Sequence, residues 1–306
     1  MGRSAVPRHF LAIDDLSAAE FEAVLDGAAA FERQLEGGER HAVLPERTLG
    51  MVFEKPSTRT RVSFETGMTQ LGGHAIFLGP DDVGLGEREP LRDTARTLSR
   101  YVDCIVARLF DHAALDELAA HASVPVINGL TDDAHPCQAL ADLLTIREHA
   151  GFDASVAWIG DGNNVARSFA LGAARVGLDC TVATPPGYGL GGDVLERAGE
   201  IGTAPATTDD PRAAAAGADV VYTDVWVSMG EEDDRERKRA AFEAGGFQVN
   251  EALLDPGTAV MHCLPARRGG EITDEILESE RSLAFEQAEN RLHTGKGLLA
   301  VLLGAL

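Results

Sequence analysis

Short apolar segments of strand length alternate with amphipathic helical stretches along this chain, and that alternation limits its fold more than any other feature. In the first half, the predicted strands are 49–53, 75–78, 104–109 and 124–127, and the predicted helices are 58–71, 90–101 and 113–121. Strands joined by helices form parallel sheets with helices packed on their faces. The first half is therefore predicted to be an α/β domain.

The second half repeats the pattern after a longer predicted helix at 136–150. Its predicted strands are 156–159, 180–183, 220–223 and 260–263, and its predicted helices are 164–176, 235–244 and 274–279. The 306 residues suffice for two domains, so we predict an α/β protein with two domains, each a parallel sheet flanked by helices. The predicted domains are 1–150 and 151–284. The terminal segment 285–306 is expected to pack back on the first domain, with an ordinary core helix as the alternative.

The chain carries a formal net charge of -22, and only three of its 27 basic residues are lysines. Nucleic acid is an improbable partner, because phosphate contacts need a basic face. An acidic, lysine-poor composition resembles that of proteins from salt-loving organisms, and an ordinary soluble acidic protein is the alternative. The charge therefore excludes one class of partner and raises the question of halophily.

Neither a targeting segment nor a membrane span is expected. The first ten residues lack the apolar core of a signal peptide, and no apolar run approaches the roughly eighteen residues that a spanning helix needs. The four cysteines lack the C-x-x-C spacing of zinc sites and are compatible with reduced thiols; they are Cys104, Cys137, Cys180 and Cys263. We expect a cytoplasmic protein without a metal or an organic cofactor.

The segment FEKPSTRTR, residues 53–61, lies where a predicted strand runs into a predicted helix. A helix N-terminus offers unpaired N–H groups and the positive end of the helix dipole, which favours phosphate. Arg59 adds a fork of charged N–H donors, and hydroxyl donors come from Ser57, Thr58 and Thr60. The alternative is an ordinary capped helix with a solvated arginine, since Ser and Thr are common N-caps.

Further polar side chains follow other predicted strands. Ligands of open parallel sheets bind at the carboxyl ends of the strands, so residues at those ends are favoured candidates. These candidates are Arg108, His135, Gln138, Asp224, Ser228 and Cys263. Their convergence would form an active site in a cleft between the two domains.

A nucleotide-binding oxidoreductase is an alternative from another class. Gly160 and Gly162 follow a strand and open a helix, as in a dinucleotide fingerprint. Val165 stands where the third glycine is required, and the next strand ends in Thr184 and Pro185 instead of an acidic residue. The fingerprint is therefore incomplete. A non-catalytic binding protein on the same fold is a further alternative.

Six motifs in order resemble those of the ornithine carbamoyltransferases within the aspartate/ornithine carbamoyltransferase family. They are FEKPSTRTR (53–61), HPCQ (135–138), GDGNN (160–164), DVWVSMG (224–230), HCLP (262–265) and AENR (288–291). STRTR and HPxQ are shared with the aspartate enzymes, whereas DxWxSMG and HCLP point to the ornithine enzymes. The resemblance implies transfer of a carbamoyl group from carbamoyl phosphate to the δ-amine of L-ornithine, giving L-citrulline and phosphate.

The resemblance also implies which residues bind carbamoyl phosphate, mainly in domain 1–150. They are Ser57, Thr58, Arg59, Thr60, Arg108, His135, Gln138, Cys263, Leu264 and Arg291. Among these, the residues implied to be catalytic are Arg108, His135 and Cys263. Arg61, the last residue of its motif, is expected to serve structure. For His135 and Gln138, which lie three apart on one helix face, capping or core hydrogen bonding is the alternative.

Domain 151–284 is implied to bind ornithine. The implied ligands of its amino-acid end and side chain are Asn164, Asp224, Ser228, Met229 and Cys263. Asp224 would supply charge to the ammonium, with a helix cap as its alternative role, and core packing is the alternative for Met229. Ser228, Met229 and Gly230 are expected to form a mobile loop, since glycine permits the backbone change of a lid.

Direct attack by the amine needs no acyl-enzyme, and His262 is expected on the opposite side of its strand from Cys263, badly placed as a base. Relatives use aspartate, putrescine or acylated ornithines as acceptors, so these remain alternatives. Family members are usually trimers or assemblies of trimers, and the residues do not reveal whether the reaction runs toward or away from citrulline. No chemistry is expected in 231–239, where i,i+4 charge pairs such as Asp234 with Lys238 predict a solvated helix face.

The acidic composition generates the first prediction. Repulsion between exposed charges is screened within roughly 3 Å at 1 M salt and reaches much further in dilute buffer. We expect activity or melting temperature to fall when salt is lowered from about 2 M to about 0.1 M, because self-repulsion destabilises the compact state. Equal activity and equal melting temperature at both salt concentrations would contradict a halophilic adaptation.

Overall fold

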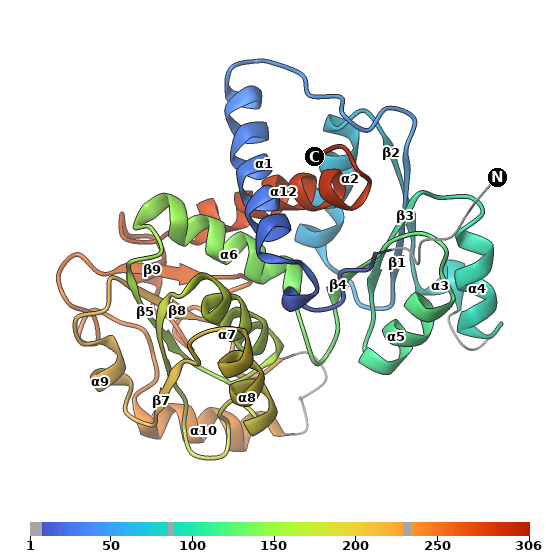
Figure 1. The fold of residues 1–306 in the computed structure, drawn as a ribbon. Coiled ribbons are helices and arrows are strands. Elements are labelled where there is room, and N and C mark those ends of the chain that lie inside the picture. The colour runs from blue at the N-terminus through green and yellow to red at the C-terminus, as the bar shows by residue number, and fades with distance from the viewer. Residues whose placement is uncertain (1–7, 85–88, 229–233) are drawn as a thin grey trace. The chain divides into compact units, whose positions relative to one another are not determined.

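A computed structural model of the chain describes residues 8–84, 89–228 and 234–306 (Figure 1). The chain forms two compact units. The first unit comprises Met1–Leu140 and Asn290–Leu306, and the second comprises Ala141–Glu289. The boundaries therefore fall within helices α6 (Pro136–His149) and α12 (Ala284–Leu302).

The first unit contains a four-stranded parallel sheet in the order β2-β1-β3-β4. Its strands are β1 (Thr48–Phe53), β2 (His74–Leu78), β3 (Cys104–Arg108) and β4 (Val126–Leu130). Its helices are η1 (Ile13–Asp15), α1 (Ala18–Glu36), α2 (Thr58–Gln70), α3 (Pro80–Val83), α4 (Leu91–Leu98) and α5 (His112–His121), with the start of α6 and the end of α12. In Figure 1, α4 and α5 pack side by side.

The second unit contains a five-stranded parallel sheet in the order β7-β6-β5-β8-β9. Its strands are β5 (Ser155–Ile159), β6 (Asp179–Ala183), β7 (Ala206–Thr208), β8 (Val220–Thr223) and β9 (Ala259–His262). Its helices are α7 (Asn164–Val176), α8 (Gly192–Ile201), α9 (Pro211–Ala215), α10 (Arg235–Gly245) and α11 (Asp274–Leu277), besides the rest of α6 and the start of α12. The predicted fold class, two α/β domains with parallel sheets flanked by helices, is confirmed.

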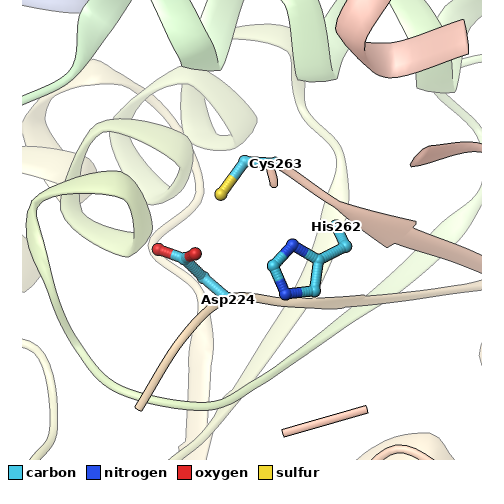
Figure 2. Close-up of side chains that lie close together, drawn as sticks. All are labelled: Asp224, His262 and Cys263. Atoms are coloured by element: carbon cyan, nitrogen blue, oxygen red, sulfur yellow. The ribbon is translucent and has the colours of Figure 1, made fainter. Parts of the chain in front are cut away.

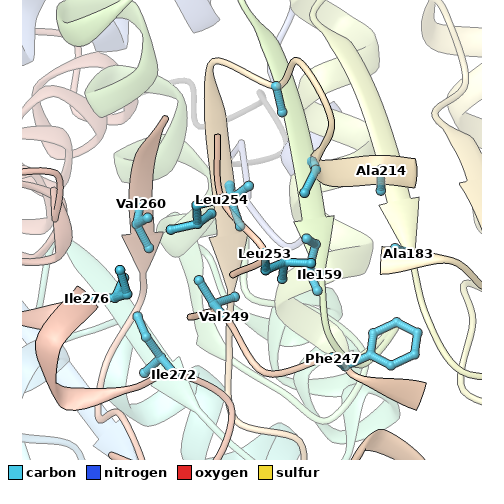
Figure 3. Close-up of a cluster of buried hydrophobic side chains, with 14 of the residues drawn as sticks. Ile159, Ala183, Ala214, Phe247, Val249, Leu253, Leu254, Val260, Ile272 and Ile276 are labelled. Atoms are coloured by element: carbon cyan, nitrogen blue, oxygen red, sulfur yellow. The ribbon is translucent and has the colours of Figure 1, made fainter. Parts of the chain in front are cut away.

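Both sheets are largely buried apart from the edge strands β2 and β7, as parallel sheets covered by helices must be. All residues of β3, β4, β8 and β9 are buried. In the second unit, Ile159, Val260, Phe247 and Ile272 belong to one apolar cluster that joins strands to the segments around them (Figure 3). Aromatic rings add to this packing, since Trp158 meets Tyr222 edge to face at 4.6 Å. The strands are therefore held rigidly, and residues at their carboxyl ends have fixed positions.

Several elements went undetected in the sequence. The largest is α1, whose apolar face includes Phe21, Val24 and Phe31. Ser17 and Glu20 form a capping box before it, and this S-x-x-E pattern was the available signal. Helices α8 and α9 and the three-residue strand β7 were also missed. β7 is short and has no apolar alternation, so its sequence does not distinguish it from a loop.

Within the described residues, no helix is both long and apolar enough to cross a membrane.

Two glycines of α12 generate a stability prediction. A Cβ on Gly297 would lie 2.3 Å from the carbonyl oxygen of Val24 in α1, whereas a Cβ on Gly295 would meet the Phe64 ring at 3.7 Å, an ordinary contact. Gly297→Ala is expected to destabilise the protein by about 1–3 kcal/mol, because two helix backbones must separate. Gly295→Ala is expected to be neutral or stabilising by up to about 1 kcal/mol, since alanine favours helix. Urea denaturation measures both, and equal effects would contradict the close approach of α1 and α12.

Candidate active site

The segment between β1 and α2 forms the helix N-terminus that its sequence predicts. Ser57 is the N-cap of α2, and its hydroxyl accepts a hydrogen bond from the N–H of Thr60 at 3.2 Å. Thr58 is exposed, Arg59 is half-buried and Thr60 is buried. Arg61 forms an ion pair with Glu65 and stacks on the Phe77 ring at 3.7 Å, which agrees with the structural role expected of it. Ser57 therefore caps α2 in the same segment in which Thr58, the first residue of the helix, is exposed.

Arg291 connects this helix start to α6 within the first unit. Its guanidinium is buried and donates to the side-chain oxygen of Gln138 and, at 3.1 Å, to the hydroxyl of Thr60. Residues from three distant motifs thus meet at one buried positive charge. Gln138 fixes the orientation of the guanidinium, so its hydrogen bond has a positioning effect as well as the core role considered for it.

Arg108 ends β3 and is also buried. Burial lowers its pKa to about 9, and the charges of Arg291 and Arg59 act in the same direction. Its Nη1 makes a long hydrogen bond of 3.5 Å to the Gly129 carbonyl, and its Nε has no hydrogen-bond acceptor among the described residues. A buried guanidinium with unsatisfied donors is strongly favoured to bind an anion.

His135, just before α6, is buried near the same arginines. Its pKa lies well below the ordinary value of 6.5. The causes are burial first and then the positive charges of Arg291, Arg108 and Arg59. The imidazole is therefore neutral at physiological pH, and it can donate or accept a hydrogen bond without carrying charge. The first unit brings together Arg59, Thr60, Arg108, His135, Gln138 and Arg291.

Asn163 and Asp224 form the second cluster, in the second unit. Asn163 follows β5 and is the N-cap of α7, where its side-chain oxygen accepts from the N–H groups of Val165 and Ala166. Its amide donates to the carboxylate of Asp224, which follows β8, at 2.9 Å. β5 and β8 are neighbours at the position where the chain reverses its direction across the sheet. A ligand crevice is expected at such a switch point.

Cys263 lies beside Asp224, and so does His262 (Figure 2). Each offers an atom within a group of three that lie within 4.8 Å of one another. The predicted placement of His262 and Cys263 on opposite sides of a strand is therefore wrong, because β9 ends at His262 and Cys263 already lies outside it. His262 is nevertheless committed elsewhere. Its Nδ1 accepts from the N–H of Leu264 at 2.8 Å, and its Nε2 donates to buried Glu271 at 3.0 Å.

These hydrogen bonds decide what His262 can do. With Nδ1 accepting and Nε2 donating, neither nitrogen has a lone pair for a proton or a metal ion unless a hydrogen bond breaks. The spacing of Asp224, His262 and Cys263 suits a metal, but the donor set does not. His262 instead orders the turn after Cys263, in which Leu264 has a positive φ of 58°.

Two family models match nearly the whole chain. Residues 8–148 match a family model described as the carbamoyl-P binding domain of aspartate/ornithine carbamoyltransferase, and residues 153–302 match its Asp/Orn binding domain. The chain belongs to the aspartate/ornithine carbamoyltransferase family. The two family models divide the chain near residue 150, whereas residues 290–302 of the second match belong to the first structural unit.

Individual relatives agree with this membership. An ornithine carbamoyltransferase of Haloquadratum walsbyi is 63% identical, with 96% of this chain and 97% of the relative covered. One from Methanoculleus marisnigri is 47% identical, with 97% of each chain covered. Among solved structures, an ornithine carbamoyltransferase from Pyrococcus furiosus has a TM-score of 0.93 at 46% identity, and each chain is covered completely.

The predicted partner of Lys238 is wrong. Lys238 was expected on a solvated helix face, paired with Asp234, but it is buried and pairs with Asp161 of the GDGNN motif at 2.8 Å. Asp234 pairs with Arg237 instead. The i,i+4 rule describes neighbours on an exposed helix and does not detect a partner 77 residues away. Asn163, Asp161 and Lys238 are the residues near this site that sequence reasoning missed.

Three further predicted substrate ligands lie after strands of the second unit. Asn164 is the first residue of α7, Ser228 is half-buried after β8, and Leu264 is half-buried in the turn after β9. Met229 and Gly230 lie outside the described residues, as does the start of the segment 231–239, residues 231–233. The hydroxyl of Ser57 serves as a helix cap, and Thr58 makes the exposed start of the helix.

His135 generates a prediction about pH. A histidine whose folded pKa is depressed contributes stability that is complete above its unfolded pKa, near 6.5, and is lost as pH falls below that value. The melting temperature should therefore fall between about pH 7 and about pH 5, and fall less steeply in His135→Gln. His74→Gln, at an exposed position of β2, is the matched control. An identical slope in His135→Gln and the parent protein would contradict the neutral, buried imidazole.

Proposed function

We propose that the protein transfers the carbamoyl group of carbamoyl phosphate to the δ-amine of L-ornithine, giving L-citrulline and phosphate. The observation that carries this proposal is the group of three arginines around the neutral, buried His135. Such a group suits a compact dianion joined to a polar carbonyl. The names of the relatives support ornithine as the acceptor.

Carbamoyl phosphate is proposed to bind at the start of α2. Arg59 and the N–H and hydroxyl groups of this helix start hold the phosphate, while Arg108 bridges phosphate and carbonyl. Arg291 completes the site through its fixed orientation by Gln138 and Thr60. The full set proposed for this substrate is Ser57, Thr58, Arg59, Thr60, Arg108, His135, Gln138, Cys263, Leu264 and Arg291.

Ornithine is proposed to bind in the second unit. Asp224, held by Asn163, pairs with the α-ammonium group, and the amide of Asn164 suits the carboxylate. Ser228 and Met229 are the further proposed ligands, and Cys263 contacts the side chain. We propose a carbamoyl-phosphate-binding domain, 1–150, which the terminal segment 285–306 joins, and an ornithine-binding domain, 151–284.

The chemical step is a direct attack by the neutral amine on the carbonyl carbon. The developing oxyanion is stabilised by Arg108, Thr60 and His135, the last of which donates from the one N–H of its neutral ring. The C–O bond to phosphate then breaks, one proton of the attacking amine passes to the leaving phosphate, and Arg59 holds the charge of that phosphate. Since ornithine arrives as an ammonium ion, the rate should rise as pH increases toward deprotonation of the δ-amine.

We propose a homotrimer or an assembly of trimers in the cytoplasm, with no nucleic-acid partner, on the basis of the family resemblance and the acidic charge. Putrescine, acylated ornithines and aspartate are the alternative acceptors. A citrulline assay at high salt, run beside product assays with each of these amines, distinguishes them.

Two substitutions test the assignment of the two substrates. Arg59→Ala is expected to lower turnover about a hundredfold or more through lost stabilisation of the phosphate. Asp224→Ala is expected to raise the KM for ornithine about tenfold or more with a smaller effect on the KM for carbamoyl phosphate. Citrulline formation measures both.

Arg61→Ala is the matched control for Arg59, because Arg61 lies two residues further along the same helix and pairs with Glu65. It should keep its turnover within about threefold of the parent protein. Near-normal kinetics in Arg59→Ala would refute the proposed phosphate site.

A further inference from the structure

Lys238 is a buried charge that the proposed chemistry does not use. Its side chain is 4% exposed, and that of its partner Asp161 is 8% exposed. A buried ion pair contributes little net stability compared with apolar residues, but removing one partner leaves an uncompensated charge. A pair of this kind is often explained by the geometry it fixes, so the question is which groups Lys238 holds in place.

Asp161 lies in the turn between β5 and α7, and this turn is fixed from several sides. The Trp158 indole donates to the main-chain oxygen of Asp161 at 3.0 Å, and the N–H of Gly162 donates to the Tyr188 carbonyl at 2.8 Å. A Cβ on Gly162 would lie 2.5 Å from the carbonyl carbon of Gly189, so this turn accepts no side chain there. These contacts hold the backbone of the turn in one conformation.

Lys238 contacts both loops that meet at this turn. Its ammonium donates to the Asp161 carboxylate and lies 5.7 Å from the centre of the Tyr188 ring. Tyr188 in turn packs on Phe242, which lies one helical turn after Lys238 in α10. The ammonium therefore joins α10 to the loop after β5 and the loop after β6.

The same turn ends in Asn163, whose side chain caps α7 and donates to Asp224. A shift of the turn would move the cap and its amide together. The chain of contacts thus runs from Lys238 through Asp161 and Asn163 to Asp224, entirely within the second unit. Asn164 follows Asn163 directly as the first residue of α7, so a shift of the turn would move it as well.

We propose that Lys238 is a positioning residue for the acceptor: through Asp161 it fixes the turn that orients Asn163, Asn164 and Asp224 toward the amino-acid end of ornithine. This rests on the proposed function, in which Asn164 and Asp224 bind that end. Lys238 does not touch substrate. It acts by holding the loop after β5 against α10.

The test compares variants of the full-length protein by the KM for each substrate and by melting temperature. Lys238→Met should raise the KM for ornithine about tenfold or more and leave the KM for carbamoyl phosphate within about twofold. Lys238→Arg keeps the charge and should recover the KM for ornithine to within about threefold of the parent value. Arg239→Met is the matched control, since Arg239 is the next residue and forms an exposed pair with Glu243.

A double variant separates positioning from stability. Asp161→Asn with Lys238→Met removes both charges, so the melting temperature should recover while the KM for ornithine stays raised. This variant also carries the test if Lys238→Met does not fold. Recovery of the KM together with the melting temperature would show a purely structural role and overturn the proposal, as would an equal effect in Arg239→Met.

Asp224→Ala serves as the reference for the acceptor site. If it raises the KM for ornithine and Lys238→Met does not, the positioning role fails while the proposed function stands. If Asp224→Ala has no effect on that KM, the proposed acceptor site itself has failed.

Discussion

The buried guanidinium of Arg291 is the interaction on which the first cluster depends. It joins the C-terminal helix to Thr60 of α2 and Gln138 of α6, which lie 231 and 153 residues away along the chain. A planar fork of donors can satisfy two partners in fixed directions, which a lysine could not do equally well. The position of the helix start that is proposed to bind phosphate therefore depends on a residue near the end of the chain.

The first cluster concentrates positive charge in a buried site, because the guanidinium groups of Arg108 and Arg291 are both buried there. The lowered pKa of Arg108 and the still lower pKa of His135 both reflect burial together with neighbouring guanidinium groups. Like charges in such a place destabilise the unliganded protein. A bound dianion would relieve that repulsion, so binding and folding would be coupled, and the stabilisation would grow with the logarithm of the ligand concentration above Kd. The electrostatic strain that favours the anion is present before it arrives.

The sequence was sufficient for the fold class, because that follows from local patterns, and its motifs contain the residues that meet at Arg291 in the first unit. Strand and helix periodicity located β1, β3, β5 and β8, and parallel sheets bring the carboxyl ends of such strands to one edge. Contacts between distant residues were inaccessible. Lys238 has an acidic neighbour at i−4, yet its partner lies in another motif, and nothing in the local charge pattern distinguishes the two. The relative placement of His262 and Cys263 was wrong because β9 ends at His262, so the alternation of side chains along a strand does not extend to Cys263.

Lysine usage connects the acidic composition to the interior. The chain has three lysines, and all three are buried: Lys55 pairs with Asp132, Lys238 pairs with Asp161, and Lys296 donates to Gln70. Every exposed basic side chain among the described residues is therefore an arginine or a histidine. Lysine offers a compact charge on a flexible stem and can lose its proton when buried, as the lowered pKa of Lys296, about 8, illustrates. All three lysines of this chain therefore mark positions where an ammonium group inside the fold has a partner.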